Sequence, residues 1–169
     1  MRILILFFFL LATVHALEDR QVLMDSISEH AIRIGHGPNT TYTFIDPLCP
    51  KSQNFIKLIS TKKELQEETS YYIFLYELPK FDSRELIVYI YQSQDPRQAL
   101  EEVMVDKDYY DIEVYETKPK TLIIMNAISK VAKQMNVKRR PYLLLFDQGS
   151  KYCRVSEGTA PCLEENDFD

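Results

Sequence analysis

The chain has 169 residues, and its 25 acidic side chains against 20 lysines and arginines leave a net charge of −5 at pH 7. An acidic chain is a poor candidate for binding nucleic acid or anionic membranes, because both need a basic surface. The length suits a single domain built around one hydrophobic core. We therefore expect one acidic domain without nucleic-acid partners.

The amino-terminal segment predicts export. Residues 1–16 carry one cation at Arg2, an apolar run over 3–12, and small residues at Val14 and Ala16 that suit a signal-peptide cleavage site. A membrane-spanning helix needs roughly 20 apolar residues, and the charges that begin at Glu18 end this run too early. No later segment is long and apolar enough, so we expect no membrane insertion after cleavage. The expected location is the periplasm, or outside the cell if the source is a eukaryote, where the sequon at Asn39 could be glycosylated.

The next part of the chain predicts a lead segment, a strand and a helix. Residues 17–34 are expected to lead into the domain, with loosely helical spacing over 20–34 and a turn at 35–39. The β-branched and aromatic residues 41–45 predict a strand that ends at Asp46-Pro47. Apolar positions over 52–65 recur at helical spacing, and Pro50 suits a first helical turn. Residues 70–78 predict a second strand, apolar enough to be buried on both faces.

The second half of the chain predicts a helical insertion, a long helix and a hairpin. Within an insertion at about 80–118, Asp82–Glu85 has the character of a capping box and Pro96 suits a first helical position, although 86–91 would also suit a strand. A long helix is expected over 118–136, a buried strand at 142–146, a turn at 147–150, a returning strand at 151–156 and an acidic tail at 164–169. This order predicts an α/β fold over residues 35–163, with helices on a mixed sheet.

Cys49 lies between the first predicted strand and the helix that follows it. Free backbone N–H groups and the positive end of the helix dipole meet at such a position, and both favour the thiolate over the thiol. Because the thiolate is the attacking species in disulfide exchange, the position predicts a reactive sulfur. The alternative is that Cys49 is a small apolar residue buried in the core.

Two short segments resemble a known family. The run Phe44-Ile45-Asp46-Pro47-Leu48-Cys49-Pro50-Lys51-Ser52 resembles the active-site segment of bacterial periplasmic disulfide isomerases, the DsbC/DsbG branch of the thioredoxin superfamily, which carry aspartate-proline before a Cys-Pro-x-Cys motif. Residues 137–143 are similar to that family's loop with its cis-proline. The resemblance covers residues 34–156. It implies a thioredoxin-like three-layer sandwich with a mixed central sheet, and it implies that Pro141 follows a cis peptide bond and faces Cys49.

Two residues depart from the family's pattern. Ser52 stands where the family has its second cysteine, so the neighbour of Cys49 on the helix cannot resolve a mixed disulfide. We expect Ser52 to hydrogen-bond either the Cys49 thiolate or free N–H groups at the helix end. Arg140 precedes the proline, where the family usually carries a small or neutral residue. A guanidinium near Cys49 would stabilise the thiolate further and make it a weaker nucleophile.

The remaining cysteines, Cys153 and Cys162, are separated by a short loop that could bring their sulfurs together. A structural disulfide between them is the first expectation for an exported chain. The alternatives are that one of them resolves a mixed disulfide at Cys49, or that both are free thiols.

No cofactor or metal is expected. His30 and His36 have no cysteine or acidic partner at metal-ligand spacing, and no glycine-rich phosphate loop is present. The sequence therefore predicts a monothiol protein that forms mixed disulfides through Cys49 with protein thiols or disulfides, or with small thiols. It leaves open a non-catalytic binding module of the same fold, a thiol that reacts with peroxide, and the oligomeric state.

Overall fold

The computed structural model describes residues 20–107, 116–146 and 153–157. The predictions for the signal peptide, the turn at 147–150 and the acidic tail lie outside the described residues, and so does Cys162. In the described ranges, no helix combines the length and the apolar character that crossing a membrane requires.

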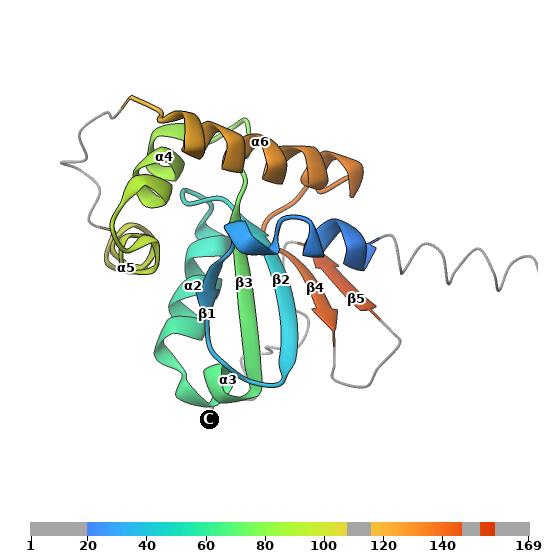
Figure 1. The fold of residues 1–169 in the computed structure, drawn as a ribbon. Helices are drawn as coiled ribbons and strands as arrows, with labels where there is room; N and C mark the ends of the chain where they lie inside the picture. The colour runs from blue at the N-terminus through green and yellow to red at the C-terminus, as the bar shows by residue number, and fades with distance from the viewer. Residues whose placement is uncertain (1–19, 108–115, 147–152, 158–169) are drawn as a thin grey trace, which may run out of the picture.

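Five strands form one mixed sheet in the order β1-β3-β2-β4-β5 (Figure 1). The strands are β1 (Ile32–Ile34), β2 (Asn39–Ile45), β3 (Thr69–Leu75), β4 (Tyr142–Phe146) and β5 (Cys153–Glu157). β3 runs parallel to β2, and the other neighbouring pairs are antiparallel. The parallel pair requires a crossover, which the helices between β2 and β3 provide. The mixed sheet of the α/β prediction is thereby confirmed.

Helices cover both faces of the sheet and give the three layers. They are η1 (Ser28–His30), α2 (Pro50–Thr61), α3 (Lys63–Glu68), α4 (Arg84–Gln92), α5 (Pro96–Glu101), the π-helical turn η2 (Glu102–Asp106) and α6 (Pro119–Gln134). On β2, Ile45 packs into a core with α2, α4 and α5, whereas Tyr42 and Phe44 pack into a second core with α6. This alternation follows from the period of two along a strand. In Figure 1, α4 and α5 lie together beyond the β1 edge of the sheet.

The helical spacing over 20–34 predicted a helix, and this prediction was wrong for the last residues of the segment. Residues 20–25 are helical, but Ile32–Ile34 form β1, which pairs with β3. Ile32 and Ile34 are buried and Arg33 is exposed, as in an edge strand with one face on the core. Three residues are too few to distinguish a strand from a helix by periodicity, so the pairing with β3 decides the conformation.

The helices of the insertion form where the sequence predicted them, with one difference in detail. The run that suited either a helix or a strand is α4, and Asp95 caps α5 by accepting hydrogen bonds from the backbone N–H groups of Arg97 and Gln98. Ser83 is the N-cap residue of α4, but its side chain makes no capping hydrogen bond. The hydroxyl donates instead to the carboxylate of Asp46, so the expected capping box does not form.

Candidate active site around Cys49

Cys49 occupies the turn from β2 into α2. It is the N-cap residue of α2 with an extended backbone, and Pro50 takes the first helical position. The backbone N–H of Cys49 donates to the carbonyl of Asp46 at 3.1 Å, and the side chain of Gln53 donates to the carbonyl of Pro47 at 2.9 Å. These bonds hold the turn, so the sulfur sits at the helix end that is positive in the helix dipole.

The sulfur of Cys49 meets the loop that precedes β4. Sγ lies 3.8 Å from the carbonyl oxygen of Arg140, to which the thiol donates, and the Arg140–Pro141 peptide bond is cis. The sheet brings the two segments together, because β4 pairs with β2 and places Tyr142 opposite Phe44. Cys49 is a free thiol with only 6% of its surface exposed.

Ser52 is fully buried in the first turn of α2. Its hydroxyl oxygen accepts a hydrogen bond from the backbone N–H of Asp46 at 3.4 Å. Within the described part of the chain, no hydrogen bond joins Ser52 to Cys49 or to a free N–H group of the helix. The side chain therefore ties the helix start to the end of β2, which neither sequence expectation included.

Arg140 is buried, and its guanidinium turns toward the end of β3. Nε donates to the carbonyl of Tyr76 at 3.1 Å, Nη1 donates to the carbonyls of Val137 and Arg139, and the guanidinium carbon lies 4.2 Å from the centre of the Tyr76 ring. Burial lowers the pKa of Arg140, and interactions with Tyr76, Asp46 and Cys49 partly oppose this effect. The bonds to backbone carbonyls and the contact with the Tyr76 ring therefore hold the guanidinium at the end of β3.

Asp46 is a buried carboxylate beside the cysteine turn and was not among the predicted site residues. Oδ1 accepts from the backbone N–H of Leu48 at 2.9 Å, and Oδ2 accepts from the backbone N–H of Leu78 and from the hydroxyl of Ser83, the latter at 3.0 Å. Asp46 and Ser83 are both fully buried. The sequence did contain a signal for Asp46, namely a charged residue at the end of an apolar strand. Such a carboxylate is buried by the fold and needs several hydrogen-bond donors around it.

The structure places Cys49, Ser52, Arg140 and Pro141 around one turn, but it does not show the predicted disulfide. β5 begins at Cys153, whose backbone pairs with Phe146, while Cys162 lies outside the described residues. The described ranges contain no cluster of three or more histidine, cysteine or acidic residues that could hold a metal ion.

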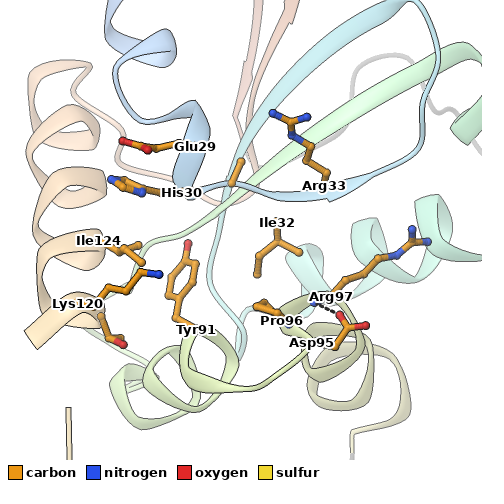
Figure 2. Close-up of a pocket in the computed structure, with 12 residues that line it drawn as sticks. Glu29, His30, Ile32, Arg33, Tyr91, Asp95, Pro96, Arg97, Lys120 and Ile124 are labelled. Carbon is orange, nitrogen blue, oxygen red and sulfur yellow. Dashed lines mark hydrogen bonds between the residues drawn. The ribbon is translucent and has the colours of Figure 1, made fainter. Parts of the chain in front are cut away.

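Two of the cavities formed by the described residues lie near the ends of β3 and β1. One, of about 660 Å³, lies between the end of β3, α4 and α6, and Arg140 is among its lining residues. The other, of about 420 Å³, lies between β1, the start of α5 and the start of α6 (Figure 2). There Tyr91 points into the space, with Lys120 beside it, while Arg97 points away. The hydroxyl of Tyr91 accepts from the backbone N–H of Leu75 at 3.0 Å, and burial raises the pKa of this phenol.

Several solved structures resemble this fold at low sequence identity. A disulfide interchange protein from Neisseria gonorrhoeae matches with a TM-score of 0.59 and 14% identity, over 79% of this chain and 89% of that one. ScsC from Proteus mirabilis in a compact conformation matches with a TM-score of 0.57 and 16% identity, over 94% of this chain and 91% of that one. BcfH from Salmonella enterica Typhimurium matches with a TM-score of 0.52 and 15% identity, over 90% of this chain and 83% of that one.

The chain has a thioredoxin-like fold. The resemblance stated from the sequence is thereby confirmed at the level of the fold, including its three layers. No protein-family model and no curated protein matches the chain. Identities of this size show a shared thioredoxin-like architecture, and the roles of the individual site residues stay predictions.

Proposed function

We propose that this protein is an exported monothiol protein that forms mixed disulfides through Cys49. The observation that carries the proposal is the position of Sγ at the N-cap of α2, beside the loop that contains Arg140 and Pro141. Free N–H groups at a helix start favour a thiolate, and this arrangement needs no metal or cofactor. The proposal includes the signal peptide at 1–16 and therefore a periplasmic location, or secretion in a eukaryote.

The proposed reaction is thiol–disulfide exchange. The Cys49 thiolate attacks one sulfur of a substrate disulfide, a bond forms between the two sulfurs, and the other substrate sulfur leaves as a thiolate. A second thiolate, from the substrate or from a small thiol, later attacks the mixed disulfide and releases Cys49. No net oxidation occurs, so the cycle suits isomerisation or capture of thiols. In this scheme, the backbone around Arg140 and Pro141 holds the substrate segment beside the sulfur.

Ser52 determines the proposed reaction type. It occupies the helical position where a second thiol would release the mixed disulfide within the same active site. A hydroxyl cannot take part in disulfide exchange, so the mixed disulfide persists until an external thiol arrives. This argues for a monothiol cycle rather than dithiol oxidation or reduction.

Mixed-disulfide formation tests the proposal directly. The purified protein is incubated with oxidised glutathione, and the adducts are mapped by mass spectrometry at each of its cysteines. We expect an adduct at Cys49 at neutral pH, and we expect Cys49→Ala to lose it while adducts at the other cysteines are unchanged. Absence of a Cys49 adduct under conditions where a small model thiol reacts would overturn the proposal.

The variant Ser52→Cys tests the monothiol assignment. With a second thiol in place, the Cys49 adduct should be lost as an intramolecular disulfide forms between Cys49 and the introduced thiol. Ser52→Ala is the matched control, because it removes the hydroxyl without adding a thiol. Equal adduct lifetimes in the wild type, Ser52→Ala and Ser52→Cys would contradict the assigned role of this position.

A second candidate function is a non-catalytic binding module, and the burial of Cys49 favours it. A sulfur with 6% of its surface exposed is poorly accessible to a large substrate. The two candidates differ in the effect of Cys49→Ala on partner capture. The binding module predicts unchanged capture, whereas the thiol protein predicts loss of every covalent complex that a reducing agent would dissociate.

A further inference from the structure

The cavity of about 660 Å³ connects to the proposed active site through Arg140. The backbone carbonyl of Arg140 contacts the sulfur of Cys49, while its side chain lines the cavity. The loop at the end of β3 forms a second connection, because Leu78 lines the cavity and donates its backbone N–H to the carboxylate of Asp46. We call this cavity the Arg140 groove.

The charge of the Arg140 groove is opposite to that of the whole chain. Its lining includes four cations, Arg84, Lys133, Lys138 and Arg140, against one carboxylate, Glu77. The chain as a whole carries a net charge of −5. Burial raises the pKa of Glu77, as do Asp46 and Asp82, while Arg84 opposes the shift. A cationic depression on an acidic protein attracts anionic ligands and repels cationic ones.

The side chain of Arg140 lines the groove and holds its position through backbone carbonyls. Arg140 is 4% exposed, and its hydrogen bonds use Nε and Nη1. Nη2 makes none of these three bonds, and the side chain of Tyr76 also interacts with the guanidinium. A nearly buried guanidinium that lines a cavity suits a carboxylate, which it can bind with charge-assisted hydrogen bonds.

We propose that the Arg140 groove selects partners whose reactive sulfur is flanked by carboxylates, such as an acidic cysteine-containing peptide segment. The inference rests on the proposed function and adds the substrate class. Arg140 contacts the carboxylate nearest the sulfur, and Lys133 and Lys138 attract acidic residues further along the segment. The apolar side chains of Leu75, Ile87 and Met125 also line the groove and contact the aliphatic parts of the peptide's side chains.

Matched peptide disulfides test this selection. Each probe is a short peptide with one cysteine blocked as a thiopyridyl mixed disulfide, and the residues flanking the cysteine are glutamates, glutamines or lysines. Attack by the Cys49 thiolate on the peptide sulfur forms the Cys49–peptide disulfide and releases thiopyridone, which is followed by absorbance. Rates measured with Cys49→Ala are subtracted to remove reaction at the other cysteines.

The glutamate peptide should react fastest and the lysine peptide slowest. Each exposed ion pair between a lysine of the groove and a peptide glutamate contributes little on its own. Lys133→Glu and Lys138→Glu should therefore each lower the reaction rate of the glutamate peptide by roughly two- to fivefold. The double variant should favour the lysine peptide over the glutamate peptide. The preference of the wild type should shrink as salt is added, because ions screen exposed charges.

Lys63→Glu is the matched control, because it changes the net charge equally from an exposed position on α3, outside the Arg140 groove. Its rates should equal those of the wild type. Lys133 lies in the last turn of α6, where a negative charge opposes the helix dipole, so Lys133→Gln provides a version without that effect. Circular dichroism and a thermal melt confirm that each variant is folded.

The outcomes separate the inference from the proposed function. If all three peptides react with Cys49 at the same rate, the acidic selection is overturned while the thiol function stands. If no peptide gives release that depends on Cys49, the proposed function fails and the inference fails with it. If the thiopyridyl disulfide of glutathione reacts as fast as the longer acidic peptide, the acidic partner is a small thiol. A slower reaction of glutathione supports an extended peptide segment.

Discussion

Replacement of Asp46 by alanine should destabilise the fold strongly, because three donors converge on this buried carboxylate. They are the backbone N–H groups of Leu48 and Leu78 and the hydroxyl of Ser83. Leaving a buried donor without a partner costs about 1–3 kcal/mol. Leu48 and Leu78 are only partly buried, so water can accept hydrogen bonds from their backbone N–H groups and reduce the cost. Ser83 is fully buried and has no such compensation. We expect the free energy of unfolding to fall by about 3–5 kcal/mol, a large part of the roughly 5–15 kcal/mol typical of a domain.

A double-mutant cycle with Ser83→Ala identifies the cause of the loss. Ser83→Ala alone should cost about 1–2 kcal/mol, because it removes one charge-assisted hydrogen bond. In the Asp46→Ala background it should cost much less, since the hydroxyl has already lost its acceptor, and the expected coupling is about 1–2 kcal/mol. Urea denaturation at neutral pH measures all four proteins, with the transition slope compared to confirm two-state unfolding. A loss below about 1 kcal/mol for Asp46→Ala, or an equal cost of Ser83→Ala in both backgrounds, would refute the reasoning.

Three further predictions concern stability. Tyr91→Phe should cost about 1 kcal/mol in a urea melt, because the backbone N–H of Leu75 loses its acceptor; an unchanged midpoint would contradict this. The pKa of Glu77 is raised in the folded protein, so its protonated form is favoured there. The resulting stability is present at low pH and is lost as pH rises through the folded pKa, and Glu77→Gln should flatten this slope; an identical pH profile would argue against it. Gly37→Ala should be strongly destabilising in a thermal melt, because its Cβ would lie 2.1 Å from the backbone nitrogen of Thr69; a melt like that of the wild type would show that the turn can relax.

Local signals were enough for the segment that carries Cys49. Strand propensity up to Ile45, helical periodicity after Ser52 and a proline at position 50 describe one continuous stretch, in which each residue's conformation depends on its immediate neighbours. The same holds for Asp95 and Pro96 at the start of α5. Caps, prolines and apolar spacing act over a few residues, so they can be read without knowledge of the rest of the fold.

Other features depended on contacts between distant parts of the chain. Residues 32–34 became a strand because β3 pairs with them, and the ambiguous run at 86–91 became α4 because its apolar face packs into the core with α2. Ser83 bonds Asp46 across 37 residues instead of capping its own helix. A residue with two local options takes the one that long-range packing and hydrogen bonding stabilise more.

The sequence by itself determined that a cysteine stands at a strand-to-helix turn, that Ser52 removes a neighbouring thiol, and that Arg140 and Pro141 precede a strand. These statements concern residue identity and local spacing. Only the tertiary structure decided that the carbonyl of Arg140 meets the Cys49 sulfur, while its guanidinium turns toward Tyr76 and the groove. The pairing of β2 with β4 creates that meeting, and burial among backbone carbonyls directs the side chain. The family resemblance implied that the two segments meet, but the direction of the guanidinium depends on contacts with distant residues that no local pattern contains.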